Sequence, residues 1–241
     1  MIINFLKNRL YEFLGAHLTY EINLFRKHQK KMRSGKFARN KIDETLESLM
    51  PYQNGFFVEL GAHDGALASN SYYFELKKNW RGVLVEPCPN LYLKCLKRRG
   101  KNNFVYHNAC VPFDYKEKFV HMKYSDSTTV SDNLDLDIYD REQHISKVRN
   151  REKNFLFGAE SATLNSLLEK SYAPPLIDFL SLDVEGAELD VLKGINFSQY
   201  NFKYIVVECR SIQRLQDHLK NFKYKFIKKL SIHDYLFALN K

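Results

Sequence analysis

Cysteine is scarce in this sequence, at four of 241 residues: Cys88, Cys95, Cys110 and Cys209. No two of them have the C-x-x-C spacing of structural zinc sites and redox motifs, so neither class of site is expected. Few, unpaired cysteines are also typical of a reducing compartment. The sequence therefore predicts a cytoplasmic protein whose cysteines stay reduced.

Long apolar runs are absent as well. No run reaches the roughly 18 apolar residues that a membrane-spanning helix needs. Residues 10–18 are largely apolar, but Glu12 interrupts them and no small-residue cleavage site follows, so we expect no secretory signal. A hydrophobic content of 44% with 14% aromatic residues excludes a disordered chain and predicts a folded protein with a real core.

Excess positive charge is missing from most of the chain, although the whole carries a net charge of +9. Residues 1–41 hold ten basic and two acidic side chains, a net charge of +8. The remaining 200 residues hold 27 basic and 26 acidic side chains, a net charge of +1. Apolar side chains at spacings of three and four predict an amphipathic helix over 2–25, and residues 41–50 predict a second helix. We expect a basic helical extension over 1–50 and a near-neutral domain over 51–241, whose charge gives no reason to expect nucleic acid.

The basic extension has two interpretations. A basic amphipathic helix binds an anionic membrane surface, and each lysine or arginine near the lipid contributes about 1 kcal/mol. This predicts a peripheral protein at the inner membrane surface. Alternatively, the helix packs on the domain or in a homo-oligomer and exposes its basic face to solvent.

From residue 56 onward, short apolar runs alternate with helical stretches. Strands are predicted over 56–60, 82–87, 103–111, 176–184, 203–208, 223–229 and 234–239, and helices over 71–79, 90–99, 161–170, 187–194 and 212–221. This alternation predicts an α/β domain with a mainly parallel sheet that ends in an antiparallel pair. Residues 113–160 are polar and break the alternation, which is typical of a lid, a binding insertion or a disordered segment.

The strongest motif is VELGAHDG at 58–65, which follows the first predicted strand. Gly61 lets the backbone turn sharply, and Gly65 allows a second close approach. The loop lies at the carboxyl end of a strand, where open α/β sheets bind nucleotides, but it lacks the G-x-G-x-x-G of dinucleotide folds. Glu59 and Asp64 make it acidic, which suits a cationic or zwitterionic nucleoside better than a phosphate. The alternative is an ordinary turn with solvated acids.

Further acidic residues follow three other predicted strands. Glu86 stands 21 residues after Gly65 and is placed to bind both ribose hydroxyls of a nucleoside. Asp183 lies at the end of the fourth strand, Glu185 follows on the turn, and Glu208 ends the fifth strand. Asp183, Glu185 and Glu208 are candidate oxygen ligands of a hard divalent cation such as Mg²⁺. Alternatively, Asp183 and Glu185 orient backbone amides of the loop without a metal.

Together these motifs resemble the FkbM family of class I S-adenosylmethionine-dependent methyltransferases. The resemblance covers roughly residues 52–210, and it is carried by 58–65, by GVLVEP at 82–87, by IDFLSLDVEGAELDVLKG at 177–194 and by IVVE at 205–208. It implies a Rossmann-like fold with a seven-stranded, mainly parallel sheet in the order 3-2-1-4-5-7-6. It also implies S-adenosylmethionine as the cofactor.

The resemblance assigns roles to individual residues. Glu86 would hold the ribose, and Asp183 would lie beside the methionine end of the cofactor, facing the acceptor. Family members often read T-L-D where this chain has Thr163-Leu164-Asn165, which puts a role of that position in substrate contact in doubt. The residues expected around the cofactor are Glu59, Gly61, Ala62, His63, Asp64, Gly65, Glu86, Asn108 and Ala109.

The chemistry implied is a displacement at a sulfonium methyl group, which depends mainly on alignment. A hydroxyl acceptor also needs its proton removed, by a base or by a metal, and the candidate catalytic residues are Asp183, Glu185 and His63. With the resemblance, we expect an O-methyltransferase for a hydroxyl of a sugar, glycan or lipid-linked saccharide, with or without Mg²⁺. Two alternatives stay open: a nucleotide-dependent Rossmann-type enzyme, and a module that docks on a membrane or a protein partner.

Overall fold

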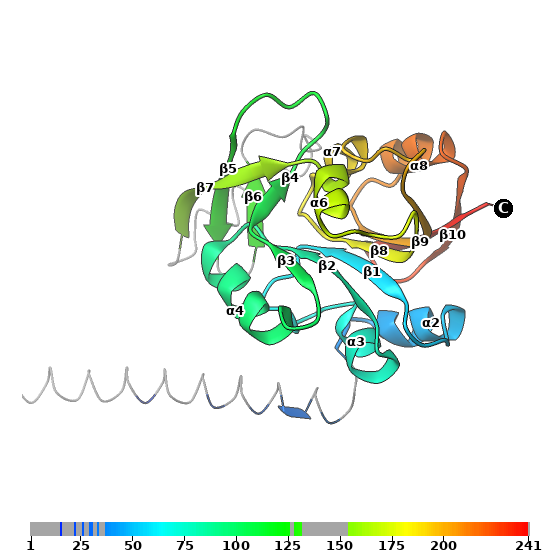
Figure 1. The fold of residues 1–241 in the computed structure, drawn as a ribbon, viewed down its shortest axis with the longest axis horizontal. Coiled ribbons are helices and arrows are strands. Elements are labelled where there is room, and N and C mark those ends of the chain that lie inside the picture. The colour runs from blue at the N-terminus through cyan, green and yellow to red at the C-terminus, as the bar shows by residue number, and fades with distance from the viewer. Residues whose placement is uncertain are drawn as a thin grey trace, which may run out of the picture.

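The computed structural model describes residues 37–125, 128–131 and 154–240, together with six scattered positions before residue 37. Within these limits the chain forms a large central sheet with helices on both faces and a smaller sheet at one side (Figure 1). The predicted helix over 2–25 and the middle of the predicted insertion, 132–153, lie outside the described residues.

The central sheet has seven strands. In spatial order they are β3 (Phe104–Tyr106), β2 (Arg81–Val85), β1 (Phe56–Leu60), β8 (Leu176–Leu182), β9 (Asn201–Glu208), β11 (Asp234–Leu239) and β10 (Tyr224–Lys229). Numbered along the chain within this sheet, the order is 3-2-1-4-5-7-6, and β11 is antiparallel to both of its neighbours. The predicted Rossmann-like α/β class is confirmed. Strands β1, β2 and β8 are buried almost throughout, which explains why they read as continuous apolar runs.

Helices cover both faces of this sheet, as Figure 1 shows. Phe57 and Phe179 point to one face, where α2, α3 and α4 pack, whereas Val58 and Leu180 point to the other, where α6, α7 and α8 pack. The helices are α2 (Ile42–Leu49), α3 (Tyr72–Lys78), α4 (Pro89–Arg99), α6 (Leu164–Lys170), α7 (Glu188–Lys193) and α8 (Gln213–Lys220).

A second sheet was not predicted. The predicted strand 103–111 is broken into β3 and β4 (Asn108–Cys110), and β4 joins β7 (Asn154–Ala162), β5 (Phe119–Ser125) and β6 (Thr128–Ser131) in the order β4-β7-β5-β6. Strand β7 also takes up the first residues of the predicted helix 161–170, which begins only at Leu164. The second sheet buries a small apolar cluster and leaves large side chains such as Leu156 exposed, so its strands carry a weak sequence signal.

Residues 37–50 pack on the domain. Helix α2 buries its apolar side in the core of the central sheet. Asp43 lies in the first turn of α2. Its carboxylate accepts hydrogen bonds from the backbone amides of Phe37 (2.9 Å) and Ala38 (3.2 Å), which precede the helix. Ala38 also forms an isolated parallel bridge with Ala68, in the loop that follows β1. The end of the basic extension is therefore attached beside that loop.

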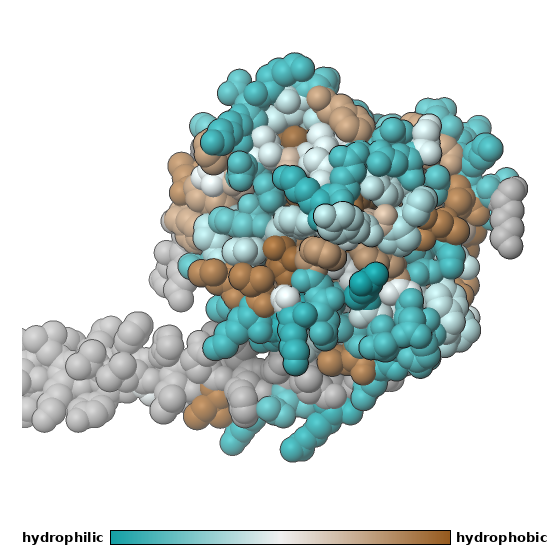
Figure 2. All heavy atoms as spheres, in the orientation of Figure 1, coloured by the Kyte–Doolittle hydropathy of each residue, from teal (hydrophilic) through white to brown (hydrophobic). Residues whose placement is uncertain are grey.

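No helix in the described ranges is long and apolar enough to cross a membrane. Figure 2 shows one face of the molecule as mostly polar, with apolar side chains in separate groups. All four cysteines are buried and free.

Candidate functional site

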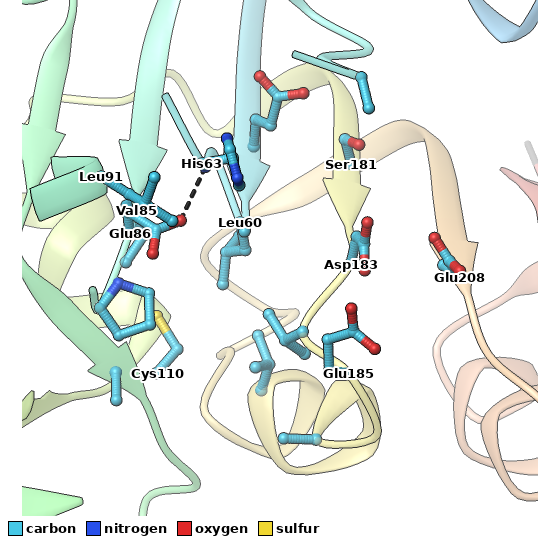
Figure 3. A pocket seen from close by; sticks show the side chains of 18 of the residues that line it. Leu60, His63, Val85, Glu86, Leu91, Cys110, Ser181, Asp183, Glu185 and Glu208 are labelled. Atoms are coloured by element: carbon cyan, nitrogen blue, oxygen red, sulfur yellow. Dashed lines mark hydrogen bonds between the residues drawn. The ribbon is translucent and has the colours of Figure 1, made fainter. Parts of the chain in front are cut away.

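A pocket lies at the carboxyl ends of the parallel strands of the central sheet (Figure 3). The strand register places Leu60 opposite both Val85 and Leu182, so β1, β2 and β8 end at the same level. The amide of Gly61 donates to the carbonyl of Val85 (3.1 Å), and the amide of Asp183 donates to that of Leu60 (3.3 Å), which draws the following loops together. The predicted residues that line the pocket are Glu59, Gly61, His63, Glu86, Asn108, Ala109, Asp183, Glu185 and Glu208.

Two glycines shape the loop after β1. Gly61 has a φ of +74°, and a β-carbon there would lie 1.9 Å from the carbonyl oxygen of Asp183. Gly65 has a φ of +81°, and a β-carbon there would lie 2.9 Å from Cγ of Arg99. Both positions therefore favour glycine, for the reasons predicted from the sequence. Gly61 lines the pocket, whereas Gly65 and the buried Ala62 do not.

Asp64 does not line the pocket, although it was expected to contact the cofactor. Its Oδ1 accepts hydrogen bonds from the amides of Ala66 (3.0 Å) and Leu67 (2.8 Å), and its Oδ2 lies 2.9 Å from Nη1 of Arg98. Burial alone would raise the pKa of Asp64, but the adjacent His63, these amides and Arg98 together lower it well below its usual value. Asp64 thus holds the shape of the loop.

Glu59 lines the pocket, but both of its oxygens bond within the protein. Oε1 accepts a hydrogen bond from the amide of Asn70 (2.7 Å), and Oε2 accepts from the hydroxyls of Ser69 (2.7 Å) and Ser71 (2.6 Å). The fully buried Arg99 lies 3.8 Å from Oε2. These bonds fix the end of the loop that leads into α3.

Glu86, which was expected to hold the ribose, lines the pocket. It follows β2, is only 3% exposed, and points toward the pocket (Figure 3). Its Oε2 accepts a hydrogen bond from the amide of His63 (2.7 Å), and its Oε1 accepts from the amide of Cys88 (2.9 Å). Burial raises the pKa of Glu86, and the two amides oppose that rise. Each oxygen keeps a lone pair for a ligand hydroxyl, as two vicinal ribose hydroxyls require.

The second sheet forms one wall of the pocket beyond Glu86. Asn108 and Ala109, expected near the adenine, come from β4, and the side-chain amide of Asn108 donates to the carbonyl of Glu160 on β7 (3.1 Å). Met122 and Ser131, from β5 and β6, line the pocket too. Sequence reasoning missed these last two because they lie in the region interpreted as a polar insertion.

The other end of the pocket is acidic. Asp183 follows β8 and Glu208 ends β9, and both side chains line this end of the pocket (Figure 3). Burial, and then the charges of Glu208 and Glu185, raise the pKa of Asp183 well above its usual value; burial and the charge of Asp234 raise the pKa of Glu208. Both carboxyl groups therefore keep their protons to a higher pH than ordinary carboxyl groups do.

The geometry gives no support to the predicted metal site. Among the residues that the structure describes, no group of three or more His, Cys, Asp or Glu side chains is arranged to hold a metal ion. The raised pKa values of Asp183 and Glu208 favour their protonated forms, which are poor metal ligands, and Glu185 follows on a turn with a φ of +55°.

His63 lies between the two ends of the pocket (Figure 3). Its backbone has a φ of +51°, and its amide is the group that bonds to Glu86. The ring Nδ1 is buried and lies 3.7 Å from Oδ1 of Asp64, which is too long for a hydrogen bond. The ring therefore belongs to the wall of the pocket.

Other polar lining residues were also missed from the sequence, among them Asn70, Ser181 and Arg39. Asn70 donates its side-chain amide to the hydroxyl of Ser181 (2.9 Å), which joins the loop after β1 to β8. Arg39 lines the pocket from the end of the basic extension. The apolar Phe37, two residues earlier and fully buried, is the sequence signal that this segment packs on the domain.

Asn165, where family members often have an acid, does not line the pocket. It is buried, and its side-chain amide donates to Glu169 (2.9 Å) and Gln199 (3.2 Å). Its side-chain oxygen accepts a hydrogen bond from the amide of Asn196 (3.1 Å). In this chain the position is therefore structural.

Comparison with known proteins agrees with this geometry. Residues 59–235 match the model of the methyltransferase FkbM domain. No curated protein is significantly similar in sequence.

Several solved structures are similar at low identity. Precorrin-6y C5,15-methyltransferase from Geobacter metallireducens is 12% identical with a TM-score of 0.43, over 83% of this chain and 88% of that chain. A methyltransferase from Geobacter sulfurreducens is 13% identical with a TM-score of 0.43, over 95% and 96%. The N-terminal domain of human METTL16 in complex with SAH is 10% identical with a TM-score of 0.40, over 81% and 66%. The family model matches well over half of the length of this chain, and the chain therefore belongs to the FkbM family of S-adenosylmethionine-dependent methyltransferases.

Proposed function

We propose that the protein transfers the methyl group of S-adenosylmethionine to a hydroxyl of a sugar, a glycan or a lipid-linked saccharide. The observation that carries the proposal is that the carboxyl groups of Asp183 and Glu208 both line the pocket, at the end away from Glu86. Glu86 and the second sheet suit the nucleoside part of the cofactor. The acidic pair is then left for the acceptor.

The residues of the acidic end fit the needs of a hydroxyl acceptor. When bound, S-adenosylmethionine supplies an electrophilic methyl group on a sulfonium sulfur. The protein has to orient the acceptor oxygen and take its proton, and a carboxylate with an ordinary pKa is a weak base for an alcohol. The raised pKa values of Asp183 and Glu208 make the pair a stronger base when it is singly ionised. Alignment in the pocket supplies the rest of the rate enhancement.

The polar lining supports a polyhydroxylated acceptor. The carboxylates of Asp183, Glu185 and Glu208 accept hydrogen bonds from hydroxyl groups, and Asn70 and Ser181 add an amide and a hydroxyl beside them. The saccharide class also rests on the resemblance of the motifs to the FkbM family.

The proposal is tested by incubating the full chain with labelled S-adenosylmethionine and a fractionated extract of its source. We expect the label in a saccharide fraction, in a form that survives mild alkali and proteases and is released as a labelled monosaccharide by acid hydrolysis. Label confined to protein or nucleic acid would contradict the proposal. So would label that mild alkali releases, because methyl esters are hydrolysed where methyl ethers are stable.

Membrane contact through residues 1–41 stays a prediction, because most of that segment lies outside the described residues. A cytoplasmic location stays a prediction too. Flotation with anionic liposomes of the full chain, and of a chain that lacks residues 1–36, tests the contact. Equal flotation of the two would contradict it. If only the full chain floats and both transfer methyl groups, docking is an accessory to methyl transfer.

A further inference from the structure

The acidic end of the pocket carries a single strong cation. Within the described part of the chain, Arg39 is the only lysine or arginine that lines the pocket. It also lines a smaller neighbouring cavity, together with Asp183, Glu208 and Asp234. Since β9 and β11 lie on the far side of β8 from β1 and β2, this cation is at the end of the pocket away from Glu86. Arg39 is therefore on the acceptor side.

The local backbone is built to hold Arg39 at this place. Its carbonyl accepts a hydrogen bond from the amide of Ile42 (3.1 Å), and the two amides before it are held by Asp43. The next two residues, Asn40 and Lys41, have φ values of +53° and +59°. A non-glycine residue in this left-handed backbone conformation costs free energy. Such residues persist where the surrounding structure requires them, often at functional sites. The turn therefore presents Arg39 at a small conformational cost.

The guanidinium of Arg39 is available to a ligand. The side chain is exposed at the mouth of the pocket, and within the described ranges no hydrogen bond or ion pair holds it. Its charge does act on Glu208, whose pKa it lowers in opposition to burial. An arginine that served only as a counter-ion would be expected in contact with the carboxylate.

We infer that Arg39 binds an anionic group of the acceptor, which makes the acceptor an acidic saccharide with a carboxylate or phosphate near the methylated hydroxyl. This inference rests on the proposed function. A guanidinium matches two oxygens of a carboxylate or phosphate with two parallel hydrogen bonds. The remaining acids of the pocket repel an anion, so an acidic acceptor needs a cation at the point where its charge lies. Arg39 thus determines specificity for acidic over neutral acceptors.

The first test examines the labelled product from the extract. We expect that product to bind an anion-exchange resin, and we expect Arg39→Gln to label it at a rate about 10- to 100-fold lower, as is typical of a lost charge-assisted hydrogen bond. Lys41→Gln is the matched control: it removes one positive charge two residues away, on an exposed side chain that does not line the pocket. It should keep the rate of the natural chain, and both variants should keep their affinity for S-adenosylhomocysteine.

The second test uses defined probes on the full chain loaded with S-adenosylhomocysteine: methyl glucoside, glucuronate and glucose 6-phosphate. At least one anionic probe should bind about tenfold or more tightly than methyl glucoside. Arg39→Gln should abolish that preference. Arg39→Lys should keep part of it, because lysine retains the positive charge but lacks the paired N–H donors of a guanidinium. Preference for glucuronate indicates a carboxylate, and preference for glucose 6-phosphate indicates a phosphate.

A neutral labelled saccharide would overturn the inference and leave the proposed function intact. An anion preference that survives Arg39→Gln, or that Lys41→Gln removes equally, would also overturn it. If none of the probes binds, the first test decides whether the inference holds, through the charge of the labelled product and the labelling rate of the Arg39→Gln variant. Absence of label from every saccharide fraction would overturn the proposed function itself.

Discussion

The carbonyl oxygen of Asp183 occupies the space beside Gly61 that a side chain would need, 1.9 Å from the position of a β-carbon. The loop expected to hold the cofactor and the backbone of a proposed catalytic acid are thus in direct contact across β1 and β8. This contact sets where the carboxyl group of Asp183 stands relative to the loop.

Gly61→Ala should separate these two elements. The added methyl group must displace the end of β8 or the loop, and the φ of +74° adds strain, so we expect a loss of about 1–3 kcal/mol in stability. Affinity for S-adenosylhomocysteine, measured by calorimetry, should fall with it. Gly158→Ala is the matched control, because a β-carbon there would lie no closer than 3.7 Å to Phe119. Equal behaviour of the two variants would show that the contact does not matter.

Glu86→Gln should weaken cofactor binding. It removes the charge that strengthens hydrogen bonds to ligand hydroxyls while keeping the shape of the side chain, and we expect a loss of about 10- to 100-fold in S-adenosylhomocysteine affinity. Glu117→Gln, on an exposed side chain away from the pocket, is the control. Undiminished affinity in Glu86→Gln would remove Glu86 from the binding site.

Asp183→Asn should lower kcat by about 100-fold or more, as loss of a general base typically does, without changing S-adenosylhomocysteine affinity. The pH dependence has a defined sign. Because the pKa values of Asp183 and Glu208 are raised, the rate should rise with pH through a range above that of an ordinary carboxyl group. In Asp183→Asn this limb should shift. Asp217→Asn, on the exposed face of α8, should leave rate and profile unchanged.

Removal of divalent metal should leave the rate unchanged. Burial raises the pKa values of Asp183 and Glu208, which favours their protonated forms over metal-binding carboxylates, and the described residues offer no three-ligand cluster. The measurement is methyl transfer after dialysis against a chelator, with and without added Mg²⁺. Activity that falls in chelator and recovers with Mg²⁺ would restore the metal site on Asp183, Glu185 and Glu208.

Glu188 should make the protein less stable as pH rises. Burial raises its pKa from 4.5 to about 7, against the opposing hydrogen bonds from the amides of Gly186 and Val184. Between these two pH values the unfolded chain has lost the proton while the folded chain keeps it, so stability falls with rising pH. The loss is complete above pH 7 and amounts to about 3 kcal/mol, at about 1.4 kcal/mol for each pKa unit.

Glu188→Gln removes this loss, because an amide does not titrate. The melting temperature of the variant, relative to that of the natural chain, should rise between pH 4.5 and pH 8. Glu117→Gln should show no such trend, since that side chain is exposed in the folded chain too. A constant difference across the range would contradict the assignment.

The sequence predicted the central sheet well because its strands are buried on both faces and its acids follow the strand ends. Glu86, Asp183 and Glu208 were found for that reason: a carboxylate after a buried strand has little structural explanation. Glu59 was assigned to the cofactor by the same logic, but Ser69, Asn70 and Ser71 occupy its oxygens, and no sequence pattern announces such bonds.

Arg39 was missed, although the apolar Phe37 two residues earlier indicates that the segment packs on the domain. It lies in a dense basic stretch, in which each charge has the same local pattern, and only the tertiary contacts of Phe37 and Ala38 distinguish it. The second sheet was missed for a different reason, since its strands bury a small cluster and carry neither a long apolar run nor a regular alternation.

The bridge between Ala38 and Ala68 fixes where the chain leaves the pocket toward its basic stretch. Lys30, Lys31, Arg33 and Lys36 lie at most nine residues from Arg39, a contour length of about 30 Å at roughly 3.3 Å per residue. A polyanionic acceptor that also bound that stretch would be kept at a high effective concentration at the pocket mouth. On a polymer with repeated acceptor groups, the enzyme would then rebind a neighbouring unit before it diffused away, which would favour clustered methylation.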